Sequence, residues 1–167
     1  MAAQQHTPRP RRVAVFGQGY VGLSVACAAA TAGYDVVGID TDDARIASLA
    51  AVPGVRADEF DSAVATRRPS FTTVGARGSD ADIVLICVPT PILERLPDLS
   101  MVAAAGRTVA EHMKPGALVV LESTTYAGTT EDLLGPILEA GHPRAGTDFL
   151  PALAPDRGDP GPTTFAC

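Results

Sequence analysis

A chain of 167 residues with 46% hydrophobic side chains is long enough to form one compact domain with its own core. Its formal net charge of −6 opposes the binding of polyanions, so nucleic acid is not an expected partner. The absence of Trp and the presence of only five Phe and three Tyr leave the core to aliphatic side chains, which favours helices packed closely on a sheet. No uninterrupted apolar segment approaches the roughly 20 residues needed to span a bilayer.

The chain is predicted to begin with a flexible leader and a strand–turn–helix unit. Residues 1–10 are polar and contain two prolines, so order should begin near Arg12. Residues 13–16 form an apolar run typical of a buried strand, and residues 21–32 have helical length, with Gly33 as a left-handed cap. Two arginines before this Ala-rich stretch also resemble the basic flank of a secretory signal. The glycines inside the stretch favour a phosphate-binding turn over a signal.

The remaining elements are predicted to alternate between strands and helices. We expect further strands at residues 36–39, 71–74, 83–88 and 117–121, and further helices at residues 43–51, 57–66, 100–113 and 129–140. Ser100 is predicted to cap the helix that it opens. Right-handed crossovers would join these elements into an α/β fold, a single doubly wound parallel sheet, whose ligands sit beyond the carboxyl ends of the strands.

The segment Gly17-Gln-Gly19-Tyr-Val-Gly22 matches the pattern GxGxxG, directly after the first predicted strand and at the start of the first helix. In this context Gly17 can make the turn, Gly19 can admit a diphosphate against the backbone, and Gly22 can let the helix meet the strand. Free amides at the helix N-terminus then stabilise the anion without a basic side chain. We therefore expect a dinucleotide to be bound by Gly17, Gly19, Tyr20, Val21 and Gly22.

Asp40 ends the second predicted strand, about 20 residues beyond the glycines, where an acidic residue accepts hydrogen bonds from the adenosine ribose. Its charge would repel a 2′-phosphate, so the sequence predicts NAD rather than NADP. Arg45, one turn into the next helix, would soften that repulsion and is counted among the cofactor-binding residues. The alternative is that the glycines form no more than a tight turn and that Asp40 caps the following helix.

Three later segments resemble the UDP-glucose/GDP-mannose dehydrogenase family in their order and spacing, and the resemblance spans residues 13–165. These segments are Val88-Pro-Thr-Pro91, Glu122-Ser-Thr-Thr-Tyr-Ala-Gly-Thr-Thr-Glu131 and Ala154-Pro-Asp-Arg-Gly-Asp-Pro-Gly161. By this resemblance Pro89, Thr90 and Thr124 lie beside the nicotinamide and the substrate, and Thr124 also takes part in catalysis. The local alternatives are that the two prolines stiffen the backbone around Thr90 and that the residues around Thr124 form turns.

The chain departs from the family at Asp156, where the family has a Glu that binds substrate and assists acid/base steps through ordered water. The shorter side chain withdraws the carboxylate by about 1.5 Å, and misplacement on that scale can lower a rate roughly a hundredfold. The form of residues 126–131 looks more like dehydrogenases of UDP-N-acetylhexosamines than like those of UDP-glucose.

The resemblance implies oxidation of the C6 alcohol of a UDP-sugar to a uronate, with two hydride transfers to NAD and a cysteine thiol for the second step. The family's central helix, nucleophilic cysteine and second domain would lie beyond Cys167, so residues 11–167 are expected to form an NAD-binding Rossmann domain that is inactive alone. Cys27 and Cys87 are expected to be small buried side chains. The scattered cysteines and histidines predict no metal site and no disulfide framework, which favours a cytoplasmic location.

Three interpretations remain open at this stage. The first is a dehydrogenase fragment that binds NAD and needs a carboxyl-terminal half for turnover. The second is a degenerate module that holds a nucleotide or a partner protein without turnover, which the departure at Asp156 favours. The third is a hydroxyacid-type dehydrogenase, which would share the glycine turn but not the three later segments. An uncovered apolar surface would also promote self-association.

Overall fold

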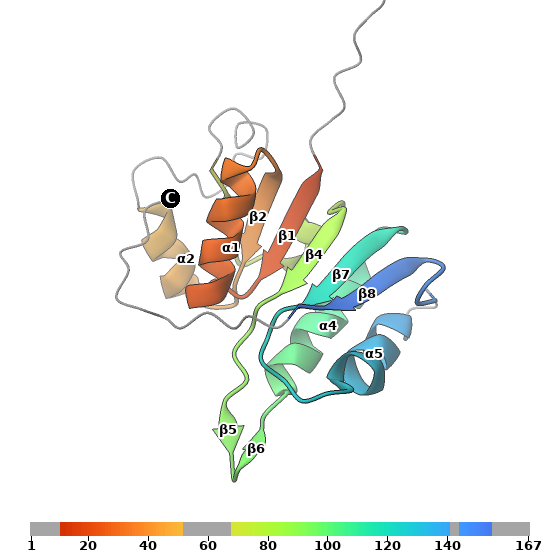
Figure 1. The fold of residues 1–167 in the computed structure, drawn as a ribbon. Helices are drawn as coiled ribbons and strands as arrows, with labels where there is room; N and C mark the ends of the chain where they lie inside the picture. The colour runs from red at the N-terminus through yellow and green to blue at the C-terminus, as the bar shows by residue number, and fades with distance from the viewer. Residues whose placement is uncertain (1–10, 52–67, 141–143, 155–167) are drawn as a thin grey trace, which may run out of the picture.

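The computed structural model describes residues 11–51, 68–140 and 144–154, which form a parallel sheet with helices on both faces (Figure 1). The strands of this sheet are β1 (Arg12–Phe16), β2 (Asp35–Ile39), β3 (Ser70–Thr72), β4 (Ile83–Ile86), β7 (Ala117–Leu121) and β8 (Phe149–Leu153). The α-helices are α1 (Tyr20–Thr31), α2 (Asp43–Ala50), α4 (Ser100–His112) and α5 (Gly135–Glu139). Smaller elements are a 3₁₀ turn (Gly75–Gly78), a π-helical turn (Thr130–Leu134) and a hairpin made of β5 (Ile92–Leu93) and β6 (Leu96–Pro97).

The strands are arranged in the order β3-β2-β1-β4-β7-β8, and every neighbouring pair is parallel. The chain moves outward from β1 through β2 to β3, then returns to place β4 on the other side of β1 and continues outward to β8. The direction of winding therefore reverses between β1 and β4. A sheet of this kind binds ligands at that point, beyond the carboxyl ends of the strands. The doubly wound fold predicted from the sequence is confirmed.

Helices cover both faces of the sheet, which explains why the central strands are continuously apolar. On one face Val102 of α4 and Leu138 of α5 are fully buried in a cluster with Ile86. On the other face Ala26 of α1 packs in a cluster with Val15 of β1, and the small side chains of α1 allow a close approach. None of the described helices has the length and apolar character needed to cross a bilayer.

Most of the predicted elements are confirmed with small shifts at their ends. The third strand ends at Thr72 and the fourth at Ile86, each two residues before the predicted end. Gly33 has a φ of 96° and follows α1 as the expected left-handed cap. The predicted leader 1–10 and helix 57–66 lie outside the described residues.

One prediction about a helix end is wrong, and one predicted helix is confirmed within one residue at each end but consists of two parts. Ser100 does not cap α4. Its amide, the first of the helix, donates to Asp98 Oδ1 at 2.9 Å, so the side chain that accepts a helical amide at this end is that of Asp98. This hydrogen bond also lowers the pKa of the Asp98 carboxyl below its usual range. The predicted helix 129–140 is divided into the π-helical turn and α5. Pro136 stands at the division, since proline has no amide proton with which to continue the α-helical ladder.

The sequence does not predict β8 or the β5–β6 hairpin. β8 contains Pro151 and exposes Leu150 and Leu153, so it lacks the continuous buried pattern of the inner strands. It pairs with β7 alone in the described sheet, and an edge strand tolerates proline. The hairpin projects beyond the carboxyl ends of the strands and turns through Glu94 and Arg95, whose φ angles are 50° and 72°. A two-residue turn of this kind is usually marked by Asn or Gly, so the usual signal is absent.

Candidate cofactor-binding site

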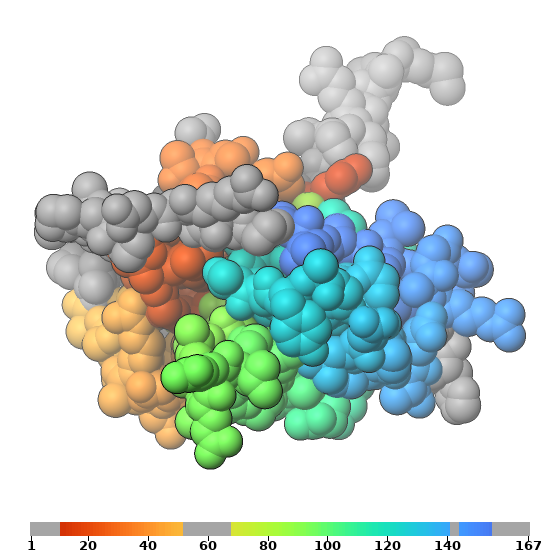
Figure 2. Space-filling model, turned by 60° about the horizontal axis from the view of Figure 1, so that its bottom comes forward, coloured from red at the N-terminus to blue at the C-terminus, as the bar shows by residue number. Residues whose placement is uncertain are grey.

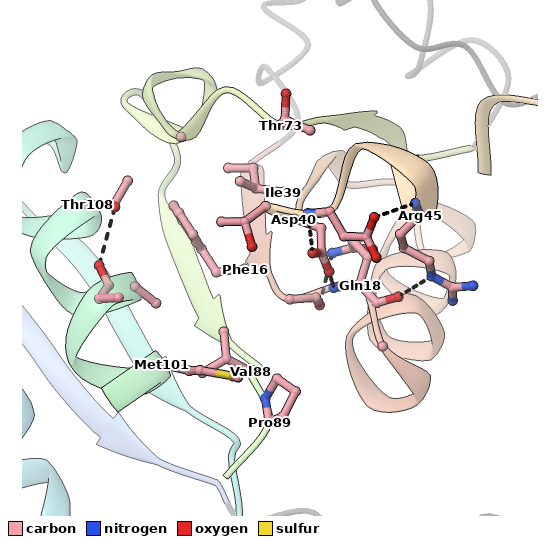
Figure 3. Close-up of a pocket in the computed structure, with 17 residues that line it drawn as sticks. Phe16, Gln18, Ile39, Asp40, Arg45, Thr73, Val88, Pro89, Met101 and Thr108 are labelled. Atoms are coloured by element: carbon pink, nitrogen blue, oxygen red, sulfur yellow. Dashed lines mark hydrogen bonds between the residues drawn. The ribbon is translucent and has the colours of Figure 1, made fainter. Parts of the chain in front are cut away.

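A cleft of about 590 Å³ opens beyond the carboxyl ends of β1, β2 and β4, at the point where the strand order reverses (Figure 3). Its walls are the loops after these strands, the loop after β3, and α4. Figure 2 looks toward this end of the molecule, where the green segment around the hairpin lies between the yellow-orange α2 and the cyan segment that follows β7. The lining residues are Phe16, Gly17, Gln18, Gly19, Ile39, Asp40, Thr41, Asp42, Arg45, Thr73, Gly75, Val88, Pro89, Met101, Ala104, Ala105 and Thr108.

The structure brings together the predicted site residues that lie within the described part of the chain. Five of them line the cleft itself: Gly17, Gly19, Asp40, Arg45 and Pro89. The others are on the first turn of α1 or on the loops after β4 and β7, next to the cleft but not in its lining: Tyr20, Val21, Gly22, Thr90 and Thr124.

The glycine turn has no room for side chains at its first and third glycines. Gly17 has a φ of 88°, and a Cβ atom built on it would lie 2.7 Å from the carbonyl oxygen of Cys87, the residue directly after β4. A Cβ built on Gly22 would lie 1.8 Å from the Gly17 carbonyl oxygen, so the start of α1 can meet the turn only with glycine there. By contrast, none of the residues that the structure describes lies within 4 Å of a Cβ built on Gly19. The turn is thus tightly packed at Gly17 and Gly22 and open at Gly19, which lines the cleft.

The amino end of α1 faces this opening, and its N-cap residue, Gly19, has no side chain with which to cap the helix. Gly19 is the N-cap residue, and the first helical hydrogen bond is donated by the Leu23 amide to the Gly19 carbonyl. The amides before Leu23 therefore lack an acceptor within the helix. Such amides, together with the positive end of the helix dipole, provide a site for a phosphate group.

Asp40 stands at the end of β2 and holds the glycine turn through its carboxylate. Its Oδ2 accepts a hydrogen bond from the Gln18 amide at 2.6 Å, and its Oδ1 accepts one from the Asp42 amide at 3.0 Å. Arg45 reaches back from α2, and its Nε donates to the Gln18 carbonyl oxygen at 2.8 Å (Figure 3). A carboxylate and a guanidinium group are therefore fixed at the same rim of the cleft. Each carboxylate oxygen has a second lone pair with which to accept a ribose hydroxyl.

The alternative role considered for Asp40, capping the following helix, belongs to Asp42 instead. The Asp42 carboxylate accepts hydrogen bonds from the amides of Ala44 and Arg45 at 2.9 and 3.1 Å, as an N-cap residue does. Asp42 thus satisfies the start of α2, and the side chain of Asp40 is left facing the cleft.

The loops after β4 and β7 are tied together by two hydroxyl groups. Thr90 Oγ1 donates to the Thr124 carbonyl oxygen at 2.7 Å, and Ser123 Oγ donates to the Val88 carbonyl oxygen at 2.7 Å. These bonds cross between loops, so the local turn considered for the residues around Thr124 does not describe Ser123, whose hydroxyl bonds to the loop after β4. Thr90 and Thr124, which are far apart in the sequence, become neighbours at the end of the cleft opposite to α2. Thr124 is exposed, so its own hydroxyl group is accessible to a ligand.

The cysteine predictions are confirmed at one position and wrong at another. Cys87 is buried with a free thiol, and its Sγ donates to Glu122 Oε2 at 3.3 Å. Cys27 on α1 is half-buried and disulfide-bonded, against the expectation of a plain core side chain. Sequence spacing does not show which cysteines are neighbours in space, so the sequence could not indicate this disulfide.

The third family-like segment cannot be placed in this site. Its Asp156, the predicted acid/base residue, lies outside the described residues, and so does Cys167. Across residues 11–51, 68–140 and 144–154, no group of three or more His, Cys, Asp or Glu side chains is placed to hold a metal ion.

The structure adds site residues that the sequence analysis missed. Met101, Ala104 and Thr108 of α4 form the wall opposite to Asp40, and Thr73 follows β3 at the rim. Their position depends on the strand order, which the sequence pattern of each element does not reveal. The sequence signal that could have indicated these α4 residues is the position of the predicted helix directly after the loop that follows β4.

These features define a dinucleotide-binding domain of the Rossmann class: the strand order, the cleft where that order reverses, and the glycine turn with an acidic residue at the end of β2. The chain belongs to the UDP-glucose/GDP-mannose dehydrogenase family, since residues 11–166 match the family's NAD binding domain. NAD is accordingly the cofactor of this domain.

Two curated relatives are more than one third identical to this chain over the matched residues. The chain is 38% identical over 157 residues to the UDP-N-acetyl-D-mannosamine dehydrogenase of Pyrococcus horikoshii, a match that covers 90% of the chain and 37% of that protein. It is 36% identical over 155 residues to the UDP-N-acetyl-D-glucosamine 6-dehydrogenase of Pseudomonas aeruginosa, covering 90% of the chain and 36% of that protein. The chain thus spans little more than a third of the length of these relatives.

Solved structures show the same fold. The UDP-D-ManNAc dehydrogenase of Pyrococcus horikoshii superposes with a TM-score of 0.79 at 39% identity, over 90% of this chain and 37% of that one. A hydroxyisobutyrate dehydrogenase from Mycobacterium tuberculosis superposes with a TM-score of 0.62 at 18% identity, over 90% and 42% of the two chains, and shares the fold alone. Because the family model matches residues 11–166, the hydroxyacid interpretation is not favoured.

Proposed function

We propose that this chain is the cofactor-binding part of a dehydrogenase that oxidises the C6 alcohol of a UDP-N-acetylhexosamine to the uronate, with NAD as the acceptor. The observation that carries the proposal is the cleft with Asp40 fixed at one rim and the Thr90–Thr124 link beside the other. The names of the relatives, which include dehydrogenases of UDP-N-acetyl-D-mannosamine and UDP-N-acetyl-D-glucosamine, support this choice of substrate. UDP-glucose is the alternative substrate.

The residues of the cleft are suited to a dinucleotide in one orientation. The open side of Gly19 and the uncapped end of α1 would hold the diphosphate. Asp40 would accept hydrogen bonds from the adenosine ribose and disfavour a 2′-phosphate, with Arg45 beside it. When bound, NAD supplies the hydride acceptor at its nicotinamide ring, which this orientation directs toward Pro89 and Thr90.

The proposed roles on the substrate side rest on the family resemblance. Thr124, with its carbonyl group held by Thr90, would orient the substrate alcohol through its exposed hydroxyl. Asp156 would assist proton transfer through ordered water, from a position one methylene farther back than the Glu of the family.

The proposal is tested in two steps. Calorimetry should show that NAD binds, and that NADP binds at least about tenfold more weakly, which corresponds to 1.4 kcal/mol. The chain is then mixed with the carboxyl-terminal part of a homologous dehydrogenase, and NADH formation is followed with UDP-N-acetyl-D-mannosamine or UDP-glucose. NADH formation supports the proposal, and the faster substrate identifies the sugar. NAD binding without NADH formation from either sugar would instead indicate a binding module without turnover.

Self-association and cellular location complete the proposal. The β5–β6 hairpin exposes 76% of Ile92, 59% of Leu93 and 71% of Leu96, an apolar surface that would favour contact with a second copy. Sedimentation of the protein and of a Leu96→Lys variant would test this, because the variant should dissociate. A cytoplasmic location is supported by the placement of residues 13–32, the segment that resembles a secretory signal, within β1, the glycine turn and α1.

A further inference from the structure

Gln18, the middle residue of the first Gly-x-Gly, turns its side chain into the protein and away from solvent. The residue is 0% exposed, and its Nε2 donates to the carbonyl oxygens of Val15 at 2.8 Å and Gly17 at 3.2 Å. The side-chain amide thus lies beneath the glycine turn and ties the turn to the end of β1.

A glycine in the neighbouring strand makes room for this side chain. Gly38 lies inside β2, where glycine weakens a strand and often marks a close approach of other atoms. A Cβ atom built on Gly38 would lie 2.7 Å from Cδ and Oε1 of Gln18 and 2.6 Å from Cδ1 of Phe71. Any larger residue at position 38 would push the Gln18 side chain out of its place. Glycine at position 38 therefore leaves the space that the side chains of Gln18 and Phe71 occupy.

The main chain of Gln18 is hydrogen-bonded to Asp40 and to Arg45, the two residues at the adenosine end of the cleft. Its amide donates to Asp40 Oδ2 at 2.6 Å, and its carbonyl oxygen accepts from Arg45 Nε at 2.8 Å (Figure 3). A rotation of the turn at this residue would therefore move Asp40 and Arg45 together. One residue links the part of the site that binds phosphate to the part that binds ribose.

Stability alone does not account for a glutamine at this position. Gln18 Oε1 is buried and has no hydrogen-bond partner among the residues that the structure describes. A buried acceptor without a partner destabilises the fold, and an unbranched apolar side chain of the same length would avoid this cost. The benefit that offsets this cost is the fixed orientation of the turn.

We infer that Gln18 is a positioning residue, whose buried amide holds the glycine turn in the shape that presents Asp40 and Arg45 to the cofactor before the cofactor arrives. The inference rests on the NAD binding of this domain and adds a role for a residue that contacts no part of the reacting groups.

The test compares Gln18→Met, which keeps the length of the side chain and removes both amide atoms, with Ser70→Ala. Ser70 makes a matched buried bond elsewhere, since its hydroxyl donates to the Val36 carbonyl oxygen at 3.2 Å on β2. With NADH fluorescence as the readout, Gln18→Met should raise the Kd about tenfold, the effect of losing one to two hydrogen bonds. Ser70→Ala should leave the Kd unchanged, and the thermal midpoint of each variant is measured to check that both are folded.

A second comparison separates positioning from a general structural effect. In an Asp40→Asn background, Gln18→Met should raise the Kd by a smaller factor than in the unmodified protein, because the two residues act through one hydrogen bond. Equal factors in both backgrounds, or an unchanged Kd in Gln18→Met, would overturn the inference. If the unmodified protein does not bind NADH, the cofactor assignment itself is wrong and the inference is lost with it.

A measurement on the unmodified protein covers the case in which Gln18→Met does not fold. Hydrogen exchange should show that the Gln18 amide is already protected without cofactor and gains little protection when NADH is added. Rapid exchange that becomes slow after NADH binding would mean that the cofactor orders the turn, and would refute a role before binding.

Discussion

The substitution Asp40→Asn offers a sharp test of how the cleft selects its cofactor. The carboxylate accepts the amides of Gln18 and Asp42, one on each oxygen, so a neutral carboxamide can accept only one of them. The ribose hydroxyls would also lose a charged acceptor. A hydrogen bond to a charged group contributes about 1.5–3 kcal/mol against about 1 kcal/mol for a neutral one. The affinity for NAD should therefore fall about tenfold, since 1.4 kcal/mol is a factor of ten.

The same change should increase the affinity for NADP. Two unit charges 4 Å apart repel each other by about 4 kcal/mol at an effective dielectric constant of 20, and exposure of the half-buried Asp40 reduces this to about 2 kcal/mol. Removing the carboxylate lifts that repulsion, and Arg45, held beside it by Gln18, can then pair with the 2′-phosphate. The ratio of the two Kd values should shift toward NADP by at least about a hundredfold.

The assay is fluorescence titration of NADH and NADPH at low and high salt. Asp43→Asn is the matched control, because it removes the same charge from an exposed carboxylate in the first turn of α2, outside the cleft lining. The control should leave the ratio unchanged at both salt concentrations. An unchanged ratio in Asp40→Asn, or an equal shift in Asp43→Asn, would refute the assignment of cofactor selection to Asp40.

Three further substitutions test the geometry of the fold and the site. Gly22→Ala should prevent native folding or NADH binding, because the new Cβ would lie 1.8 Å from a main-chain oxygen of the turn, and a folded variant with normal affinity would contradict this. Ser123→Ala should lower the free energy of unfolding in urea by about 1 kcal/mol, since it removes the hydrogen bond to the Val88 carbonyl, and no change would mean that the loops are joined otherwise. The Lys114 ammonium, hydrogen-bonded to Asp82, lowers the pKa of that carboxyl below its usual value. The stabilisation of the fold by this ion pair is therefore present at neutral pH and is lost as the pH falls through the lowered pKa. Asp82→Asn should accordingly destabilise the protein by about 1 kcal/mol at neutral pH and by less in acid, and equal losses at both pH values would contradict the ion pair.

The fold was largely predictable because its main elements are encoded locally. The inner strands are continuous apolar runs, and the glycine turn follows one of them directly, so neither depends on distant contacts to be recognised. β8 was missed because it is stabilised by its place beside β7 and not by its own pattern, as its exposed Leu150 and its Pro151 show. The cap of α4 was assigned to the wrong residue because Asp98 and Ser100 are both good capping residues, two positions apart.

The candidate site was predictable as a set of residues but not as a network. The sequence indicates Asp40 by its distance from the glycines and Arg45 by its place one turn into the next helix, whereas their common attachment to Gln18 is visible only in the structure. In the same way, the threonines after β4 and β7 were named by resemblance to a family. Their hydrogen bond could not be foreseen, because it depends on how the two loops are directed after leaving the sheet.

The sequence by itself determined which segments are buried strands, where the phosphate-binding turn lies and which acid follows it, because each of these features is a pattern within a few neighbouring residues. The tertiary structure alone decided that Gly38 must be glycine, that Gln18 faces inward, and that Thr90 meets Thr124. These contacts join residues 20 to 34 positions apart, as from Gln18 to Gly38 and from Thr90 to Thr124. They exist because the parallel strands bring their carboxyl ends to one edge, where distant loops share the same space.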